Sequence, residues 1–130
     1  MNILRSVDIE DQIRLALADY FTVYVRPLPA KYDLPNVMVT ATGGTTGNTI
    51  DTFTVTLDTR AETDADAYEL MTTVIGALEV QTQKQVGCLR HMTVNSLARW
   101  GNDPVRPDLK LCTATIQVTA HKESFEISES

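Results

Sequence analysis

Residues 50–80 read IDTFTVTLDTRAETDADAYELMTTVIGALEV, and the hydrophobic period changes within this stretch. In its first part apolar and polar side chains alternate, so Phe53, Val55 and Leu57 fall on one face of an extended chain. β-branched and aromatic residues dominate there, as they do in half-buried strands. Apolar residues then recur with helical spacing, at Ala67, Met71, Val74 and Leu78. We therefore predict a strand followed by a helix that covers the apolar face of the sheet.

The start of this helix is marked by the sequence Thr63-Asp64-Ala65-Asp66. A threonine followed three residues later by an acidic residue resembles a capping box, and acidic side chains are favoured at the positive end of the helix dipole. The same pattern fades near residues 81–87, where we expect the helix to end.

The other segments show the same two periodicities. A stripe formed by Ile9, Ile13, Ala16 and Tyr20 predicts a first helix over residues 8–20. Alternating apolar residues predict four more strands, over residues 21–26, 36–42, 89–100 and 109–120. In the third of these strands the alternation is irregular, which indicates a β-bulge or a partly covered second face.

The connections have the composition of turns and loops. Three prolines within residues 26–35 predict an extended connector. The segment Gly43–Thr49 contains no large apolar residue and joins two strands, so we predict a hairpin loop longer than a tight turn. Residues 101–108 are predicted to form a second loop, and residues 122–130 a polar tail that is mobile or becomes ordered on a partner.

The order of elements predicts an α+β fold, with a mostly antiparallel mixed sheet of about five strands and two helices packed on one face. At 130 residues the chain is predicted to hold one domain, over residues 1–121. Its formal net charge of -6 does not favour binding to a nucleic-acid backbone. No signal peptide or membrane-spanning run is recognisable, so we expect folding in the cytoplasm.

The two cysteines are predicted to remain unpaired. Cys88 and Cys112 lie on two strands of a predicted hairpin, and the expected pairing places them roughly 20 Å apart. Both are therefore expected to act as small buried hydrophobic residues.

Several patterns could indicate chemistry, and each has a simpler explanation. The glycines of Gly43–Gly47 could form a phosphate cradle, but such a cradle precedes a helix, whereas a strand follows here. A zinc site could use Cys88, His91, Cys112 and His121, but no paired motif accompanies them and Cys88 and His91 point to opposite faces. We predict no metal site.

Acidic residues cluster around the central strand and the helix start, at Asp51, Asp58, Glu62, Asp64 and Asp66. Paired acids can serve glycoside hydrolysis, but a helix cap beside a solvated rim explains the cluster more simply. We predict no catalytic residue, no cofactor and no enzymatic activity. Trp100, Arg99, Arg106 and Tyr32 are of residue types that are common at protein interfaces, and Trp100 lies beside Arg99 where a predicted strand meets a loop. Trp100 could equally close one end of the core.

The chain resembles the tail-terminator, or tail-completion, proteins of long-tailed (siphovirus) bacteriophages. The resemblance is carried by Leu34-Pro35-Asn36-Val37-Met38-Val39, the Gly43-Gly44 loop, the strand Asp51–Asp58 and the capped helix that follows it. It covers about residues 8–120 as an order of elements, and its motifs are strand patterns that identify no functional residue.

This resemblance implies a structural virion protein of the tail or neck. It would form a ring, usually a hexamer, that caps the head-proximal end of the tail tube, stops tube polymerisation and joins the tail to the head connector. The partners implied are further copies of the chain, the tail tube protein and the head–tail connector protein, with DNA passing through an acidic lumen. We predict contacts with neighbouring rings at Gly43, Gly44, Thr45, Thr46, Gly47, Asn48, Arg99, Trp100 and Arg106.

Two alternatives stay open. The chain could be another component of the phage neck or head–tail connector with the same architecture. It could also be a small ligand-binding or enzymatic α+β domain, which would contain a deep pocket with convergent polar groups.

Overall fold

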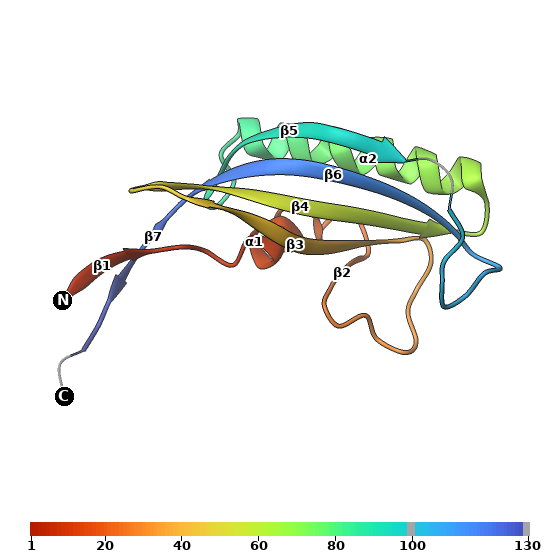
Figure 1. The fold of residues 1–130 in the computed structure, drawn as a ribbon, viewed down its shortest axis with the longest axis horizontal. Helices are drawn as coiled ribbons and strands as arrows, with labels where there is room; N and C mark the ends of the chain where they lie inside the picture. The colour runs from red at the N-terminus through yellow and green to blue at the C-terminus, as the bar shows by residue number, and fades with distance from the viewer. Residues whose placement is uncertain (99–100, 129–130) are drawn as a thin grey trace.

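The computed structural model describes residues 1–98 and 101–128. These residues form two helices and seven strands (Figure 1). The helices are α1 (Ile9–Leu17) and α2 (Asp64–Gln83). The strands are β1 (Asn2–Arg5), β2 (Val23–Val25), β3 (Asn36–Thr46), β4 (Ile50–Ala61), β5 (Leu89–Ala98), β6 (Lys110–His121) and β7 (Glu123–Glu126).

Five strands form one sheet in the order β2-β3-β4-β6-β5. Only β2 and β3 run parallel, and the other neighbours are antiparallel. The strand predicted from residues 50–58 is central, and β4 pairs with β6 along its whole length, from Ile50 opposite His121 to Ala61 opposite Lys110. The predicted α+β fold with a mostly antiparallel sheet of five strands is confirmed.

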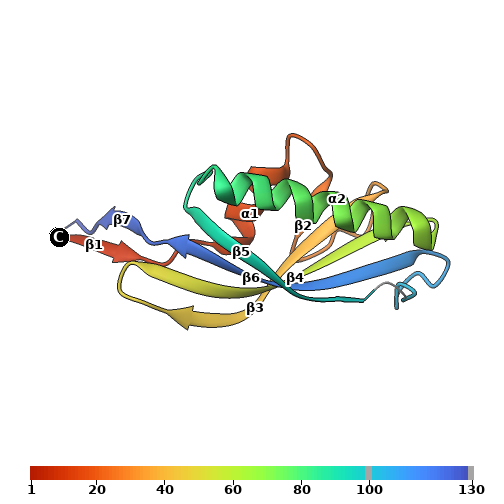
Figure 2. The same cartoon turned by 90° about the horizontal axis from the view of Figure 1, so that it is seen from above.

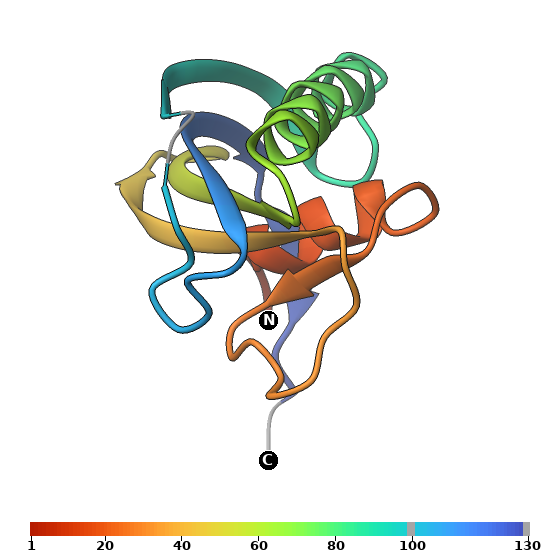
Figure 3. The same cartoon turned by 90° about the vertical axis from the view of Figure 1, so that its right-hand side faces the viewer.

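Both helices lie on the same side of this sheet (Figure 3). The helix α2 contacts β4, β5 and β6, whereas α1 contacts β2, β3 and α2. The predicted stripe of α2 is fully buried at Ala67, Met71, Val74 and Leu78. Burying a large apolar side chain stabilises a fold by about 1.5–3 kcal/mol, so this stripe is a main source of stability.

Side-chain caps fix the start of each helix. The Asp8 carboxylate accepts the backbone N–H of Asp11 at 3.2 Å, and the Thr63 hydroxyl accepts that of Asp66 at 3.1 Å. The predicted start of α2 is therefore confirmed. The helix α1 is shorter than predicted, since it ends at Leu17, and the strand expected over 21–26 is reduced to β2. In the described residues no helix is long and apolar enough to cross a bilayer.

The prediction of a long hairpin loop over Gly43–Thr49 is wrong. The strand β3 continues through Gly43–Thr46 after a bulge at Thr42, and these residues pair with Asp51–Thr54 of β4. Gly44 has φ +153°, and a Cβ atom there would lie 2.3 Å from the carbonyl oxygen of Thr52. The glycines therefore permit a bulged strand to twist and approach its neighbour closely, which composition alone does not distinguish from a loop.

The β-bulge predicted for the strand over residues 89–100 is confirmed. In β5 the pairing with β6 shifts between Leu89 and His91 and again between Val94 and Ser96. The first shift resets the alternation, so Leu89 and Met92 are both buried although simple alternation puts them on opposite faces.

The two ends of the chain form an element that the sequence analysis did not predict. The strand β7 lies within the segment expected to be a polar, mobile tail, and it pairs antiparallel with β1. This two-stranded ribbon, which we call the arm, projects from the body beyond one end of the sheet (Figures 1 and 2). The tail is thus ordered, through residue 126, on the N-terminal strand of its own chain.

Candidate interaction surfaces

The loop between β5 and β6 is held by a buried ion pair. Arg60 Nε donates to Asp103 Oδ2 at 2.7 Å, and the two side chains are only 10% and 2% exposed. The other oxygen of Asp103 accepts the backbone N–H of Val105 at 2.9 Å and that of Arg106 at 3.4 Å. One carboxylate therefore ties the loop to the central strand and shapes its turn.

The pKa of Asp103 reflects these contacts. Burial acts to raise the pKa, but the hydrogen bonds from Val105, Arg60 and Arg106 and the charge of Arg60 outweigh it, so the pKa of Asp103 is lowered. The Asp103 carboxylate is therefore ionised in the folded domain near neutral pH.

The tip of this loop presents an apolar and a cationic side chain side by side. Val105 is 85% exposed, and the Arg106 guanidinium donates to Asp108 Oδ2 at 3.1 Å. The hydrogen bond and charge of Asp108 raise the pKa of Arg106, with a smaller contribution from Tyr32 in the segment between β2 and β3. Of the predicted contact residues, Arg106 is thus at an exposed loop tip, whereas Arg99 and Trp100 lie outside the described residues.

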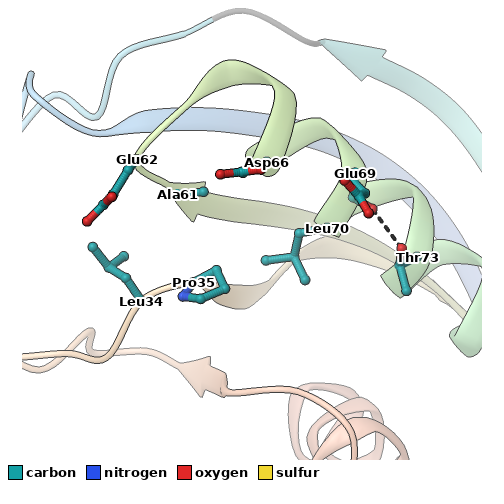
Figure 4. Close-up of a pocket in the computed structure, with 8 residues that line it drawn as sticks. All are labelled: Leu34, Pro35, Ala61, Glu62, Asp66, Glu69, Leu70 and Thr73. Atoms are coloured by element: carbon teal, nitrogen blue, oxygen red, sulfur yellow. Dashed lines mark hydrogen bonds between the residues drawn. The ribbon is translucent and has the colours of Figure 1, made fainter.

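A hollow of about 520 Å³ lies between the start of α2, the end of β4 and the start of β3. Figure 4 shows its apolar floor, made by Leu34, Pro35 and Leu70, with carboxylates around it. The remaining lining residues are Ala61, Glu62, Asp66, Glu69 and Thr73. Within the described part of the chain, none of these three carboxylates forms an ion pair.

The predicted contact residues Gly43, Gly44, Thr45, Thr46, Gly47 and Asn48 are all exposed. They form the end of the β3–β4 hairpin, which lies beside the base of the arm (Figures 1 and 2). The structure therefore brings this set together, but as a hairpin end and not as an open loop.

Asp51 joins that hairpin end to the arm. It is 2% exposed, and its Oδ1 accepts the Thr46 hydroxyl at 2.6 Å and the Gly47 N–H at 3.2 Å. Lys122 Nζ lies 3.8 Å from the same oxygen. Burial acts to raise the pKa of Asp51, but the nearby Ser6 hydroxyl, the hydrogen bonds from Thr46 and Gly47 and the charge of Lys122 outweigh it and lower the pKa.

Replacing Asp51 by alanine is expected to loosen the hairpin end and the arm together. The Thr46 hydroxyl and the Gly47 N–H would lose their shared acceptor and the Lys122 ammonium its counter-charge, which predicts a free energy of unfolding lower by about 1–3 kcal/mol. Hydrogen exchange should show faster exchange in residues 46–51 and 122–126. Asp58→Ala is the matched control, since Asp58 lies on the same strand and, among the described residues, its carboxylate accepts a hydrogen bond only from Thr113. Equal exchange in both variants would contradict the coupling.

The arm has one apolar face. Ile3 lies opposite Phe125, and Met1 exchanges two backbone hydrogen bonds with Ile127, of 3.0 and 2.8 Å. These four side chains share a face because alternate residues of a strand point the same way. Met1 is 67% exposed, and Phe125 and Ile127 are each 39% exposed. Arg5 packs over the Phe125 ring at 3.6 Å and pairs with Glu123.

The sheet face opposite the helices, which we call the open sheet face, is polar and partly exposed over its middle. Between residues 52 and 58 of β4 and 113 and 119 of β6 this face carries no Lys or Arg. Its side chains are mostly hydroxyls, with one carboxylate that accepts a hydrogen bond from Thr113: Thr52, Thr54, Thr56, Asp58, Thr113, Thr115, Gln117 and Thr119.

The structure separates the residues of the alternative chemical sites. Asp51 lies at the arm end of β4, Asp58 on the open sheet face, and Glu62 and Asp66 beside the hollow. Cys88 and Cys112 are thiols near opposite ends of the β5–β6 pair. Among the described residues no group of three or more His, Cys, Asp or Glu is placed to hold a metal ion.

Two features of these surfaces were missed by sequence reasoning. The arm joins residues at both ends of the chain, and the Arg60–Asp103 pair joins residues far apart in sequence.

A scan against models of known protein families and a search of curated proteins found no match to this chain. The resemblance to tail terminators therefore stays a prediction.

Proposed function

We propose that this chain is a structural protein that assembles into a closed ring, a hexamer, at the head-proximal end of a phage tail tube. The ring would end tube polymerisation and join the tail to the head connector. In this proposal the partners are other copies of the chain, the tube protein and the connector protein, and the chain acts in the virion and not as an enzyme.

The observation that carries the proposal is the arm with its exposed apolar face. Two strands alone are marginally stable in water, and three or more strands or a packed partner are needed to stabilise them. Here the paired residues Met1, Ile3, Phe125 and Ile127 present apolar surface outside the main core. Apolar patches of this kind mark protein–protein contacts, so assembly would cover what the monomer exposes.

The open sheet face supports the same function. Its hydroxyl side chains and its lack of Lys and Arg between residues 52–58 and 113–119 offer little attraction to phosphate groups. If this face borders the lumen, DNA could pass without being held.

The first test is the mass of the purified chain over a range of concentrations, with negative-stain images of the same samples. We expect rings with a central hole, and we expect added protein to stop the growth of tail tubes in a polymerisation assay. A chain that stays monomeric at every concentration and also leaves tube growth unchanged would refute the proposal.

A variant of the arm tests the observation itself. Phe125→Asp is expected to reduce ring formation or tube capping, because it places a charge on the apolar face of the arm. Leu15→Asp is the matched control, since Leu15 is 57% exposed on α1, away from the arm. Circular dichroism should show that both variants fold. If the two variants assemble equally well, the arm does not take part in assembly.

A further inference from the structure

The β5–β6 loop and the hollow beside α2 have complementary chemistry. The loop tip offers an apolar side chain, Val105, next to a cation, Arg106. The hollow is lined by apolar side chains and by the carboxylates of Glu62, Asp66 and Glu69. Val105 has the largest exposed fraction among the exposed large hydrophobic side chains of the described residues, at 85%.

We propose that the tip of the β5–β6 loop inserts into the hollow of a neighbouring copy of this chain. Val105 would rest on Leu34, Pro35 and Leu70, and Arg106 would face the carboxylates. The inference rests on the proposed ring and identifies the contact between its subunits.

Within one chain the loop and the hollow lie on different sides of the sheet. Arg60, which holds the loop, points to the same sheet face as Thr56 and Asp58, because alternate residues of a strand share a face. The hollow lies on the other face, on the helix side. Figure 3, which looks onto this end of the molecule, shows the loop and α2 on different sides. Two different patches that meet in this way make a heterologous contact, which closes into a ring when the rotation between subunits allows it.

The loop is already shaped for binding. The Asp103 carboxylate holds it through Arg60 and through the N–H groups of Val105 and Arg106, so little conformational freedom would be lost on insertion. The Arg106–Asp108 pair is at the surface, with side chains 51% and 66% exposed. Water screens such pairs strongly, so Arg106 can exchange this partner for the acidic hollow.

The three apolar residues of the hollow also line a neighbouring hollow. Leu34, Pro35 and Leu70 line a second hollow of about 280 Å³ that is bordered by Asn36. Asn36 is 1% exposed, and its Oδ1 accepts no hydrogen bond from any of the described residues.

Disulfide trapping between two variants that each carry one introduced cysteine tests the contact directly. Val105→Cys places a thiol at the loop tip, and Thr73→Cys places one in the wall of the hollow. We expect a cross-linked dimer when the two variants are mixed and oxidised, and none from either variant alone, which also controls for Cys88. A chain that carries both substitutions should give a ladder of cross-linked oligomers.

Thr72→Cys is the matched control for the hollow, since Thr72 is the exposed neighbour of Thr73 on α2 and does not line it. A dimer formed equally well with Thr72→Cys would overturn the contact, as would a dimer formed by Val105→Cys alone. If the chain forms rings but the two variants give no mixed dimer, this contact is refuted and the proposed ring is not. A mixed dimer from a chain that never closes into rings would support the contact and refute the ring.

Substitution of the loop tip measures the strength of the contact. Val105→Asp is expected to raise the concentration needed for assembly by at least about tenfold, since central apolar anchors dominate interfaces. The side chain is exposed in the monomer, so the fold should be unaffected. Leu15→Asp is again the control, and an unchanged assembly concentration for Val105→Asp would overturn the proposal.

Discussion

Asp103→Ala is expected to lower the free energy of unfolding by about 3–5 kcal/mol, because it leaves the Arg60 guanidinium buried without its counter-charge. The side chain of Arg60 is 10% exposed, and its Nη1 already has no hydrogen-bond partner among the described residues. The same substitution removes the acceptor of the Val105 N–H. Urea denaturation of the variant and the natural chain measures the difference.

Two further variants separate the hydrogen bonds within the loop from the ion pair with Arg60. Asp103→Asn keeps an oxygen that can accept the Val105 N–H but removes the charge and the oxygen that accepts from Arg60 Nε, so its loss of stability should be smaller than that of alanine. Arg60→Met combined with Asp103→Leu removes both charges, and replacing a whole buried pair by apolar residues is often neutral. Should Asp103→Ala cost no more than a surface substitution such as Asp108→Ala, the pair would not be the anchor of the loop.

The stabilisation by Asp103 has a defined dependence on pH. Because the fold lowers its pKa, the ionised carboxylate stabilises the protein above the unfolded value of 3.8. This contribution is lost as the pH falls below that value and through the lowered folded pKa. The stability of Asp103→Asn should therefore fall less steeply than that of the natural chain below about pH 4.

The parts of the fold that were predicted correctly depend on local periodicity. The alternation around Val55 and Leu57 and the helical spacing of Met71 and Leu78 each identify one face of one element, and both faces are buried. The Thr63 cap acts over three residues. Such signals are contained in a short window, so a sequence suffices to find them.

The parts that were missed depend on pairing between distant segments. Ile3 and Phe125 form a cross-strand pair in the arm, but neither short strand has a pattern that reveals its partner. Asp103 is one acidic residue in a loop until the fold places Arg60 beside it. At Gly44, composition indicates a loop, whereas the close approach to Thr52 requires a glycine within a strand.

The candidate surfaces follow the same division. Exposure of the β3–β4 hairpin end and of Arg106 was predictable, because polar and glycine-rich segments between strands lie at the surface. The hollow was not, since Leu34 lies in the connector before β3, Glu62 in the turn after β4 and Leu70 in α2, and only the folded chain brings them together. A docking surface assembled from several elements has no local signal in the sequence.

Leu57→Ala is expected to destabilise the fold by about 2–5 kcal/mol, through the lost burial of the side chain and the cavity that remains. Leu57 is fully buried on the central strand, between Val39 of β3 and Ala114 of β6. Regular strands pair on both sides of this position, so the backbone has little room to collapse into the cavity. Urea denaturation should show a lower midpoint with an unchanged slope.

Leu15→Ala supplies the matched control, because the chemical change is identical and Leu15 is 57% exposed on α1. It should alter stability by no more than about 0.5 kcal/mol, since a good helix former replaces an exposed side chain. The contrast separates burial from residue type: if the two variants lose similar stability, the sheet around Leu57 is not the closed core that its pairing indicates. Cross-linking of Val105→Cys with Thr73→Cys in the Leu57→Ala background measures a different property: whether the contact between copies survives a weakened core.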